Sequence, residues 1–293
     1  MNKKSILITT LIIVVSLAFV TAVYAVASKK VDIFSSDKPN KDVLQYWIDQ
    51  NKNSSNEVDQ AIAKYLENRN QQLDATSDYT SFFALDEAYN TYILGLDMKH
   101  LPAMIKKIGN NDQNSYILSF AVSRKLRVSK LNSIVDEGPG SNGKWTSEYK
   151  KIAASAPDKV KEISKKYKDI KNKGTKAKIE SNDKSEIIRL GYLALPYLLD
   201  EIANGEYYFN EVLEDYAQMS NDNSALYADV TDTVELKLDI PENTAIKEAK
   251  EEQKVVDKEN KIEEKTISVS DFTKKNKDKV DVVRVLVDDA KAK

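Results

Sequence analysis

Hydrophobic residues recur every three or four positions along much of the chain, which is the spacing of amphipathic helices. Asn40 and Asn56 precede two of these stretches and are suited to cap the first turn of a helix. Pro157 lies inside the longest stretch and predicts either two helices or one kinked helix there. The pattern predicts a mainly α-helical body whose inward-facing positions are Leu44, Trp47, Ile48, Val58, Ile62, Tyr65, Leu66, Phe82, Leu85, Ala88, Tyr92, Ile93, Trp145, Tyr149, Ile152, Ala156, Val160, Ile163, Tyr167 and Ile170.

Two stretches share a second pattern, in which Leu-Gly ends one helix, Leu-Pro begins the next and Asn ends that one. Glycine permits the backbone conformation of a helix C-terminal cap, and proline is tolerated in a first turn because its missing N–H is not needed there. The landmarks are Gly95, Leu101-Pro102 and Asn110 in the first stretch, and Gly191, Leu195-Pro196 and Asn204 in the second. A third apolar helix is predicted after each, with Tyr116, Ile117, Phe120 and Val122 in one and Phe209, Val212, Leu213 and Tyr216 in the other.

These paired stretches resemble HEAT-like helical repeats, whose units join two helices through a short turn and a Leu-Pro start. The second stretch is the better match, because the first has two extra residues between Gly95 and Pro102. The resemblance implies stacked helical hairpins, with the early helices of residues 41–70 as a third layer. An irregular all-helical domain with two similar hairpins is the alternative.

The composition changes after residue 221. Residues 233–238 and 280–287 look like strands, and residues 242–265 form a charged stretch with few apolar positions. This region is expected to be a small α/β module or a charged, partly disordered tail. The predicted organisation is a signal or anchor at 1–27, a linker at 28–41, an α-helical domain at 42–220 and a charged C-terminal segment at 221–293.

The N-terminus has the features of an export signal. Lys3 and Lys4 precede an apolar stretch that ends in small residues, and signal peptidase would cleave between Ala27 and Ser28. The stretch is also long enough to remain as a membrane anchor. The protein is therefore expected to be secreted or displayed on a bacterial cell surface.

Composition excludes several classes of protein. The 293 residues contain no cysteine, which excludes disulfides, thiolate metal sites and a cysteine nucleophile. The formal net charge of −2 gives no general affinity for nucleic acid. With only 8 glycines and 6 prolines, tight turns are scarce, which disfavours a β-sandwich or barrel.

One local concentration of charge is a candidate binding surface. Lysines crowd the polar face of the predicted helix around residues 159–178, opposite its apolar stripe. They could contact an anionic membrane or a wall polymer, or they could form an ordinary solvated face. The candidate contacts are Lys159, Lys161, Lys165, Lys166 and Lys168.

No sequence motif identifies a reaction, and neither a cofactor site nor a metal-ligand set is predicted. His100 is the only histidine, and Asp97 precedes it at a spacing that would let a carboxylate orient the imidazole on a helix. Carboxylates at Glu211, Glu214 and Asp215 cluster on one predicted helix, but the sequence does not define a catalytic pair.

We therefore expect a non-enzymatic binding or scaffold protein of the cell surface, with an unknown protein partner in the envelope. A cell-wall-active, glycosidase-like hydrolase and a membrane-tethered regulatory or immunity-type protein are the alternatives.

Overall fold

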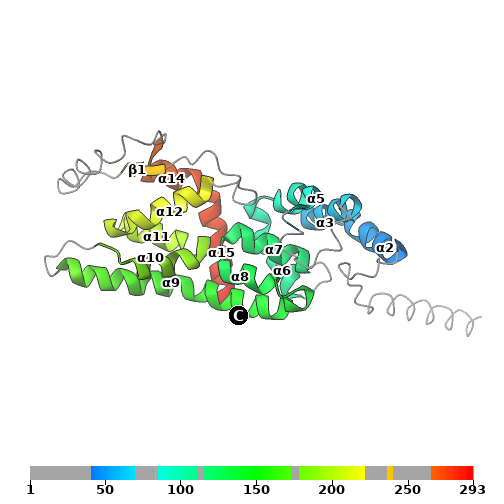
Figure 1. Ribbon diagram of the computed structural model, residues 1–293, viewed down its shortest axis with the longest axis horizontal. Helices are drawn as coiled ribbons and strands as arrows, with labels where there is room; N and C mark the ends of the chain where they lie inside the picture. Colours follow the sequence, from blue (N-terminus) through cyan, green and yellow to red (C-terminus); the bar gives the residue numbers. More distant parts are fainter. Residues whose placement is uncertain are drawn as a thin grey trace, which may run out of the picture.

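The protein is mainly α-helical, as the sequence predicts. The computed structural model describes residues 41–69, 83, 85–110, 115–172, 178–221, 236–239 and 265–292. Figure 1 shows an elongated body with the first helices at one end, the helices around residues 181–221 at the other, and one long helix along an edge.

Two helices form the N-terminal end of the described body. They are α2 (Lys41–Lys52) and α3 (Glu57–Asn68), and they pack against each other. The predicted cap at Asn56 is confirmed, since its side chain accepts a hydrogen bond from the Val58 amide at 2.9 Å. Asn40 lies outside the described residues. The predicted core positions of α3 are all buried, namely Val58, Ile62, Tyr65 and Leu66.

The first Leu-Pro hairpin consists of short helical segments. They are α5 (Glu87–Tyr89), the π-helix η2 (Asn90–Leu94), the 3-10 turn η3 (Met98–His100), α6 (Leu101–Gly109) and α7 (Ser115–Leu126). The prediction that Leu85 faces the core is wrong, because Leu85 is 60% exposed and Phe83 is buried instead. Asp86 caps a new helix by accepting from the amides of Ala88 and Tyr89, so the helical pattern restarts there. Phe82 lies outside the described residues.

The second hairpin follows the same order. Its elements are α10 (Ser181–Arg189), η5 (Gly191–Leu193), α11 (Leu195–Ala203), η6 (Tyr207–Phe209) and α12 (Asn210–Asn221). The Leu-Pro pairs begin α6 and α11, and Asn110 and Asn204 are their C-caps, as predicted. Gly191 has a φ of +56°, which fits the predicted cap role, but Gly95 has a φ of −68° and uses no left-handed freedom.

Between the hairpins, α8 (Ser129–Val135) and η4 (Pro139–Ser141) lead into the long helix α9 (Asn142–Asn172). Pro157 lies within α9, which is one helix, so the two-helix alternative is wrong. The predicted apolar stripe of α9 is confirmed. Trp145, Tyr149, Ala156, Val160, Ile163 and Tyr167 are buried, and Ile152 and Ile170 pack partly buried against the core.

The C-terminal region contributes a short sheet and two helices. The parallel strands β1 (Leu236–Asp239) and β2 (Lys265–Ser268) pair, and α14 (Val269–Lys275) and α15 (Lys277–Lys291) follow. The predicted strand at 233–238 overlaps β1 at 236–238, and its first three residues lie outside the described residues. The strand predicted at 280–287 is wrong, because this segment belongs to α15. Its β-branched residues favour a strand, but burial at helical spacing of Val280, Val283, Leu286 and Val287 outweighs that propensity.

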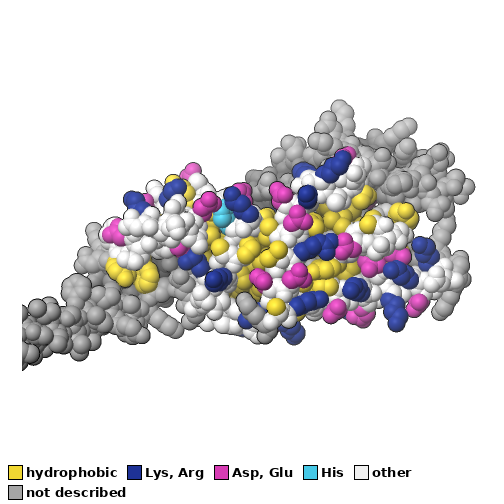
Figure 2. All heavy atoms as spheres, turned by 180° about the vertical axis from the view of Figure 1, so that it is seen from behind, with side chains coloured by type: hydrophobic (Ala, Val, Ile, Leu, Met, Phe, Trp, Pro, Cys, Tyr) yellow, Lys and Arg dark blue, Asp and Glu magenta, His cyan; other side chains and the backbone are white. Residues whose placement is uncertain are grey.

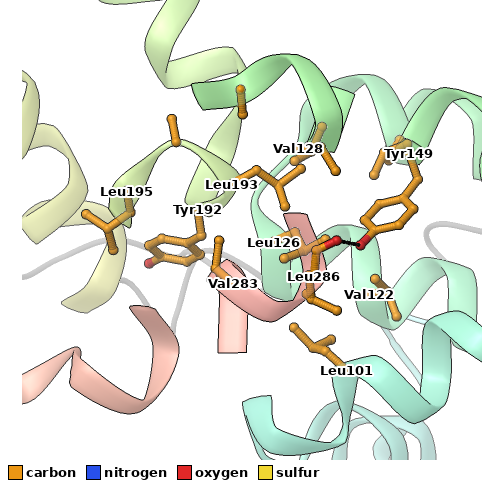
Figure 3. Close-up of a cluster of buried hydrophobic side chains, with 14 of the residues drawn as sticks. Leu101, Val122, Leu126, Val128, Tyr149, Tyr192, Leu193, Leu195, Val283 and Leu286 are labelled. Carbon is orange, nitrogen blue, oxygen red and sulfur yellow. Dashed lines mark hydrogen bonds between the residues drawn. The ribbon is translucent and has the colours of Figure 1, made fainter. Parts of the chain in front are cut away.

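Helix α15 lies in a groove between the two hairpins. It contacts η3 and α6 of the first, η5 and α11 of the second, and α9. Figure 3 shows Leu286 and Val283 of α15 among buried side chains from both sides, including Leu101 and Leu193. The Tyr149 hydroxyl of α9 donates a hydrogen bond to the Leu286 carbonyl at 3.3 Å. The C-terminal helix is thus part of the core that unites the two hairpins.

Candidate functional site on the surfaces of α9 and α15

Three of the five candidate lysines on α9 make ion pairs with the second hairpin. Lys159 lies 2.7 Å from Glu186, Lys166 lies 2.8 Å from Asp183, and Lys168 lies 3.0 Å from Glu201. The carboxylates raise the pKa of each of the three lysines, mainly through their hydrogen bonds. These charges join α9 to α10 and α11.

The remaining two candidates, Lys161 and Lys165, are exposed on the outer edge of α9. Within the described part of the chain, neither makes an ion pair. The same edge also carries acidic side chains at helical spacing, with Asp158 three residues before Lys161 and Asp169 four residues after Lys165. The outer edge of α9 is therefore a surface of mixed charge, with its positive charge concentrated on two free lysines.

A polar cluster lies where α9 meets the end of α11. Glu201 accepts hydrogen bonds from the Ser164 hydroxyl at 2.5 Å and from Lys168 at 3.0 Å. The Glu206 carboxylate lies 3.7 Å from the same lysine. The Tyr208 hydroxyl donates to the Ser164 carbonyl at 2.9 Å, and burial raises the pKa of Tyr208.

This cluster brings two carboxylates to one lysine, but it encloses them. The side chains of Glu201 and Glu206 are only 13% and 8% exposed. A glycosidase needs carboxyl groups on either side of an open sugar cleft, so this arrangement suits helix packing better than hydrolysis. Sequence reasoning missed both glutamates, although an acidic residue on α11 beside a lysine-rich helix was an available signal.

His100 connects the first hairpin to α3. Its Nε2 lies 2.5 Å from Glu57 Oε2, and its Nδ1 lies 3.3 Å from the carbonyl oxygen of Asp97. The Asp97 carboxylate does not orient the imidazole, because it lies 3.8 Å from Lys99 Nζ instead. The hydrogen bond from His100 lowers the pKa of Glu57. His100 is therefore a polar link between η3 and α3.

Two residues of the acidic cluster predicted on α12 face lysines of the second hairpin and of the segment before it. Asp215 pairs with Lys184 of α10 at 3.0 Å, and Glu211 lies 4.0 Å from Lys178. Glu214 is half-buried on the same helix. The Asp215–Lys184 pair thus links α12 to α10.

Two lysines, Lys125 and Lys279, are half-buried beside the core. Lys125 of α7 donates to the Leu94 carbonyl at 2.7 Å, and Lys279 of α15 lies 4.0 Å from the centre of the Tyr192 ring. Burial lowers the pKa of both to about 8, and for Lys279 the neighbouring cations Arg127 and Lys275 add to this effect. Both sites therefore favour the neutral amine more than water does.

The outward face of α15 carries one exposed apolar residue among charged ones. Val285 is 51% exposed there, and four exposed aspartates share the helix. Figure 2 shows hydrophobic side chains reaching the surface in the middle of this side of the molecule, between charged ones. The aspartates are Asp278, Asp281, Asp288 and Asp289.

The predicted signal segment and its cleavage position between Ala27 and Ser28 lie outside the described residues. Of the helices that the structure describes, none is long and apolar enough to cross a membrane. Across the same residues, no group of three or more histidine and acidic side chains is placed to hold a metal ion. No protein family, no curated protein and no solved structure matches this chain.

Proposed function

We propose that this chain is an exported, non-enzymatic binding protein of the bacterial cell surface, and that its helical hairpins bind a partner protein. The hairpins are similar to HEAT-like repeats, which present extended surfaces suited to protein binding. Fold alone does not determine function, so the proposal depends on one particular feature of the body.

That feature is the position of α15. The two hairpins and α9 together form a groove that holds an amphipathic helix, with Val283 and Leu286 buried in it. Helix-in-groove packing is a recurring way for proteins to bind peptides and other helices. A body that packs one helix across both hairpins has the architecture of a helical scaffold.

The charged residues support the same proposal. Two carboxylates of the second hairpin are held by lysines of α9, Glu201 by Lys168 and Asp183 by Lys166. Ion pairs of this kind fix how helices pack against one another. They leave the exposed surface of the body for recognition.

In the test, the chain from Ser28 onward is immobilised as bait. It is then exposed to native envelope proteins that were extracted after chemical cross-linking in cells. We expect saturable capture of a specific envelope protein, reproduced with both purified components. The hydrolase alternative predicts instead that the same protein releases sugar from purified peptidoglycan. It also predicts that this activity disappears when one of the acidic residues is replaced by its amide. Sugar release with that dependence would overturn the proposal.

A further inference from the structure

His100 has an oxygen atom facing each of its two ring nitrogens. Nε2 lies 2.5 Å from Oε2 of Glu57 in α3, and Nδ1 lies 3.3 Å from the backbone carbonyl oxygen of Asp97. The imidazole side chain is only 13% exposed, so the protein surrounds most of the ring. The ring thus occupies the junction between the first hairpin and α3.

Only one protonation state of the ring satisfies both contacts. A backbone carbonyl can only accept a hydrogen bond, and the same holds for an ionised carboxylate. Glu57 is held in the ionised form, because the hydrogen bond from His100 and the charge of Lys99 lower its pKa. The imidazolium has an N–H at both nitrogens and donates to both oxygens. Neutral imidazole has one N–H and turns a lone pair toward the second oxygen.

A second polar contact joins the first hairpin to α3. Lys107 of α6 pairs with Asp59 of α3, and their side chains are 20% and 15% exposed. Lysine and aspartate ordinarily stay charged on both sides of the range in which imidazole titrates. This pair is therefore a constant attachment of α3, whereas the strength of the His100 contact depends on pH.

Other charged groups surround the same turn. Lys99 lies 3.8 Å from the Asp97 carboxylate, and Lys125 of α7, whose pKa is about 8, also interacts with Asp97. Among these kinds of group, imidazole is the one that ordinarily titrates between about pH 5.5 and about pH 7. Helix α15 packs against η3 as well, and the charged side chains of its last turn are Asp288, Asp289 and Lys291.

We propose that His100 is a pH-sensitive clamp, whose imidazolium fastens α3 to the first hairpin and whose neutral ring holds α3 less tightly. Hydrogen bonds between charged groups are roughly twice as strong as neutral ones, so loss of the proton weakens one contact and removes the donor of the other. Glu57 is 66% exposed, and water competes for its oxygens. The change is therefore a partial loosening of α3. This inference goes beyond the proposed function and does not depend on it.

The experiment measures hydrogen–deuterium exchange of the α3 amides in the full chain at about pH 5.5 and about pH 7, corrected for the intrinsic pH dependence of exchange. In the wild type we expect exchange about threefold faster at the higher pH. His100→Gln should give equal corrected rates at the two pH values, because glutamine does not titrate. Glu57→Gln should do the same, because an amide can donate to or accept from either form of the ring.

Asp59→Asn is the matched control, since it breaks the other contact between α3 and the first hairpin. It should speed exchange of α3 at both pH values and keep the threefold ratio between them. A ratio near one in the wild type would overturn the clamp. So would a His100→Gln variant that keeps the ratio of the wild type.

A second measurement needs no substitution. His100 is the only histidine of the chain, so the carbon-bound protons of its ring give NMR signals that report the protonation of this one residue. These signals should move over the same pH range in which α3 exchange changes. Exchange that changes while the ring signals stay in place would assign the effect to another group and refute the proposal. Neither measurement uses an envelope partner, so failure here leaves the proposed binding function untouched.

Discussion

The two Leu-Pro helices, α6 and α11, occupy equivalent places in their hairpins and share their buried positions. Leu101 and Leu195 begin them, and Met104 and Leu198 lie one turn later, all four fully buried. The helices differ at the charged position two turns from the start, which is Lys107 in α6 and Glu201 in α11.

Each of these charges meets its opposite on a different neighbour. Lys107 lies 2.5 Å from Asp59 of α3, and Glu201 lies 3.0 Å from Lys168 of α9. The apolar positions thus define the helix, and the charge determines which neighbour it can face without leaving an unpaired ion. In this way, the ion pairs can direct two similar hairpins to different places in one body.

The first prediction tests Gly191 and Gly95, the glycines at the end of the helix that precedes each Leu-Pro helix. A Cβ at Gly191 would contact the Leu126 carbonyl and lie 2.7 Å from Arg127 O, in a left-handed conformation. Left-handed strain of about 1–2 kcal/mol and overpacking against rigid backbone of about 1–3 kcal/mol should together make Gly191→Ala cost about 2–5 kcal/mol in unfolding free energy. Urea denaturation measures this cost.

Gly95→Ala is the matched variant in the first hairpin. Its backbone is right-handed, and the added Cβ would meet the Thr91 carbonyl within the same turn. It should cost less than Gly191→Ala. Equal costs would show that the two turns are equally constrained and would remove this difference between the hairpins.

The second prediction concerns the shared buried positions. Met104→Ala and Leu198→Ala each remove a fully buried side chain from equivalent places, so each should cost about 2–4 kcal/mol. The measurement is chemical denaturation with a common slope for all variants. A tolerant Leu198 beside a sensitive Met104 would contradict the equivalence of the hairpins.

The third prediction concerns the charged position. Glu201→Lys should cost about 1–3 kcal/mol because it faces Lys168 and leaves Ser164 without its acceptor. Adding Lys168→Glu should restore part of the loss, since it reverses the pair. A double-mutant cycle measures the coupling between the two residues. Lys107→Glu with Asp59→Lys is the matching cycle in the first hairpin, and a coupling near zero in both would refute the role of these charges.

The sequence predicts those parts of the fold that depend on local periodicity. The α9 stripe, the Asn56 cap and the Leu-Pro starts are all encoded within a few residues of where they act. The C-terminal helix could not be predicted in this way. Its run of valines has strand propensity, and only the groove formed by distant hairpins makes helical burial of Val283 and Leu286 favourable.

The candidate binding residues were harder to predict for the same reason. A lysine on a helix face looks solvated in sequence, and its partner is revealed only by the fold, as Asp183 is for Lys166 across 17 residues. The pairing leaves Lys161 and Lys165 as the exposed pair.

The fourth prediction uses the buried lysine in each half. Lys125 and Lys279 have a pKa of about 8 in the folded protein and an ordinary value of 10.5. Between these values the unfolded chain binds more protons, so stability should rise with pH. From pH 8 to 9, about one unit below the ordinary pKa of tyrosine, we expect a gain of about 1 kcal/mol after allowing for partial solvent screening.

Lys125→Met and Lys279→Met should each reduce this rise, and urea denaturation across the same pH range measures it. The two variants also compare the halves, because Lys125 has a carbonyl acceptor and Lys279 has an aromatic ring. Stability that falls from pH 8 to 9 in the wild type would contradict the lowered pKa of both lysines.

The smallest effect is expected at the free lysines of α9. Lys161→Glu/Lys165→Glu changes two exposed side chains without ion pairs in the described part of the chain, so stability should change by less than about 0.5 kcal/mol per residue.

Because Asp158 and Asp169 share this edge, we expect little co-sedimentation with anionic vesicles or wall polymer even in the wild type. The vesicle assay is run at about 0.1 M and 1 M salt, where the Debye length falls from about 10 Å to about 3 Å. Strong wild-type binding that disappears at high salt and in the double variant would instead establish an anionic-surface site. Lys168→Glu is the informative companion, because Lys168 is tied to Glu201: it should lower stability whether or not the surface binds anything.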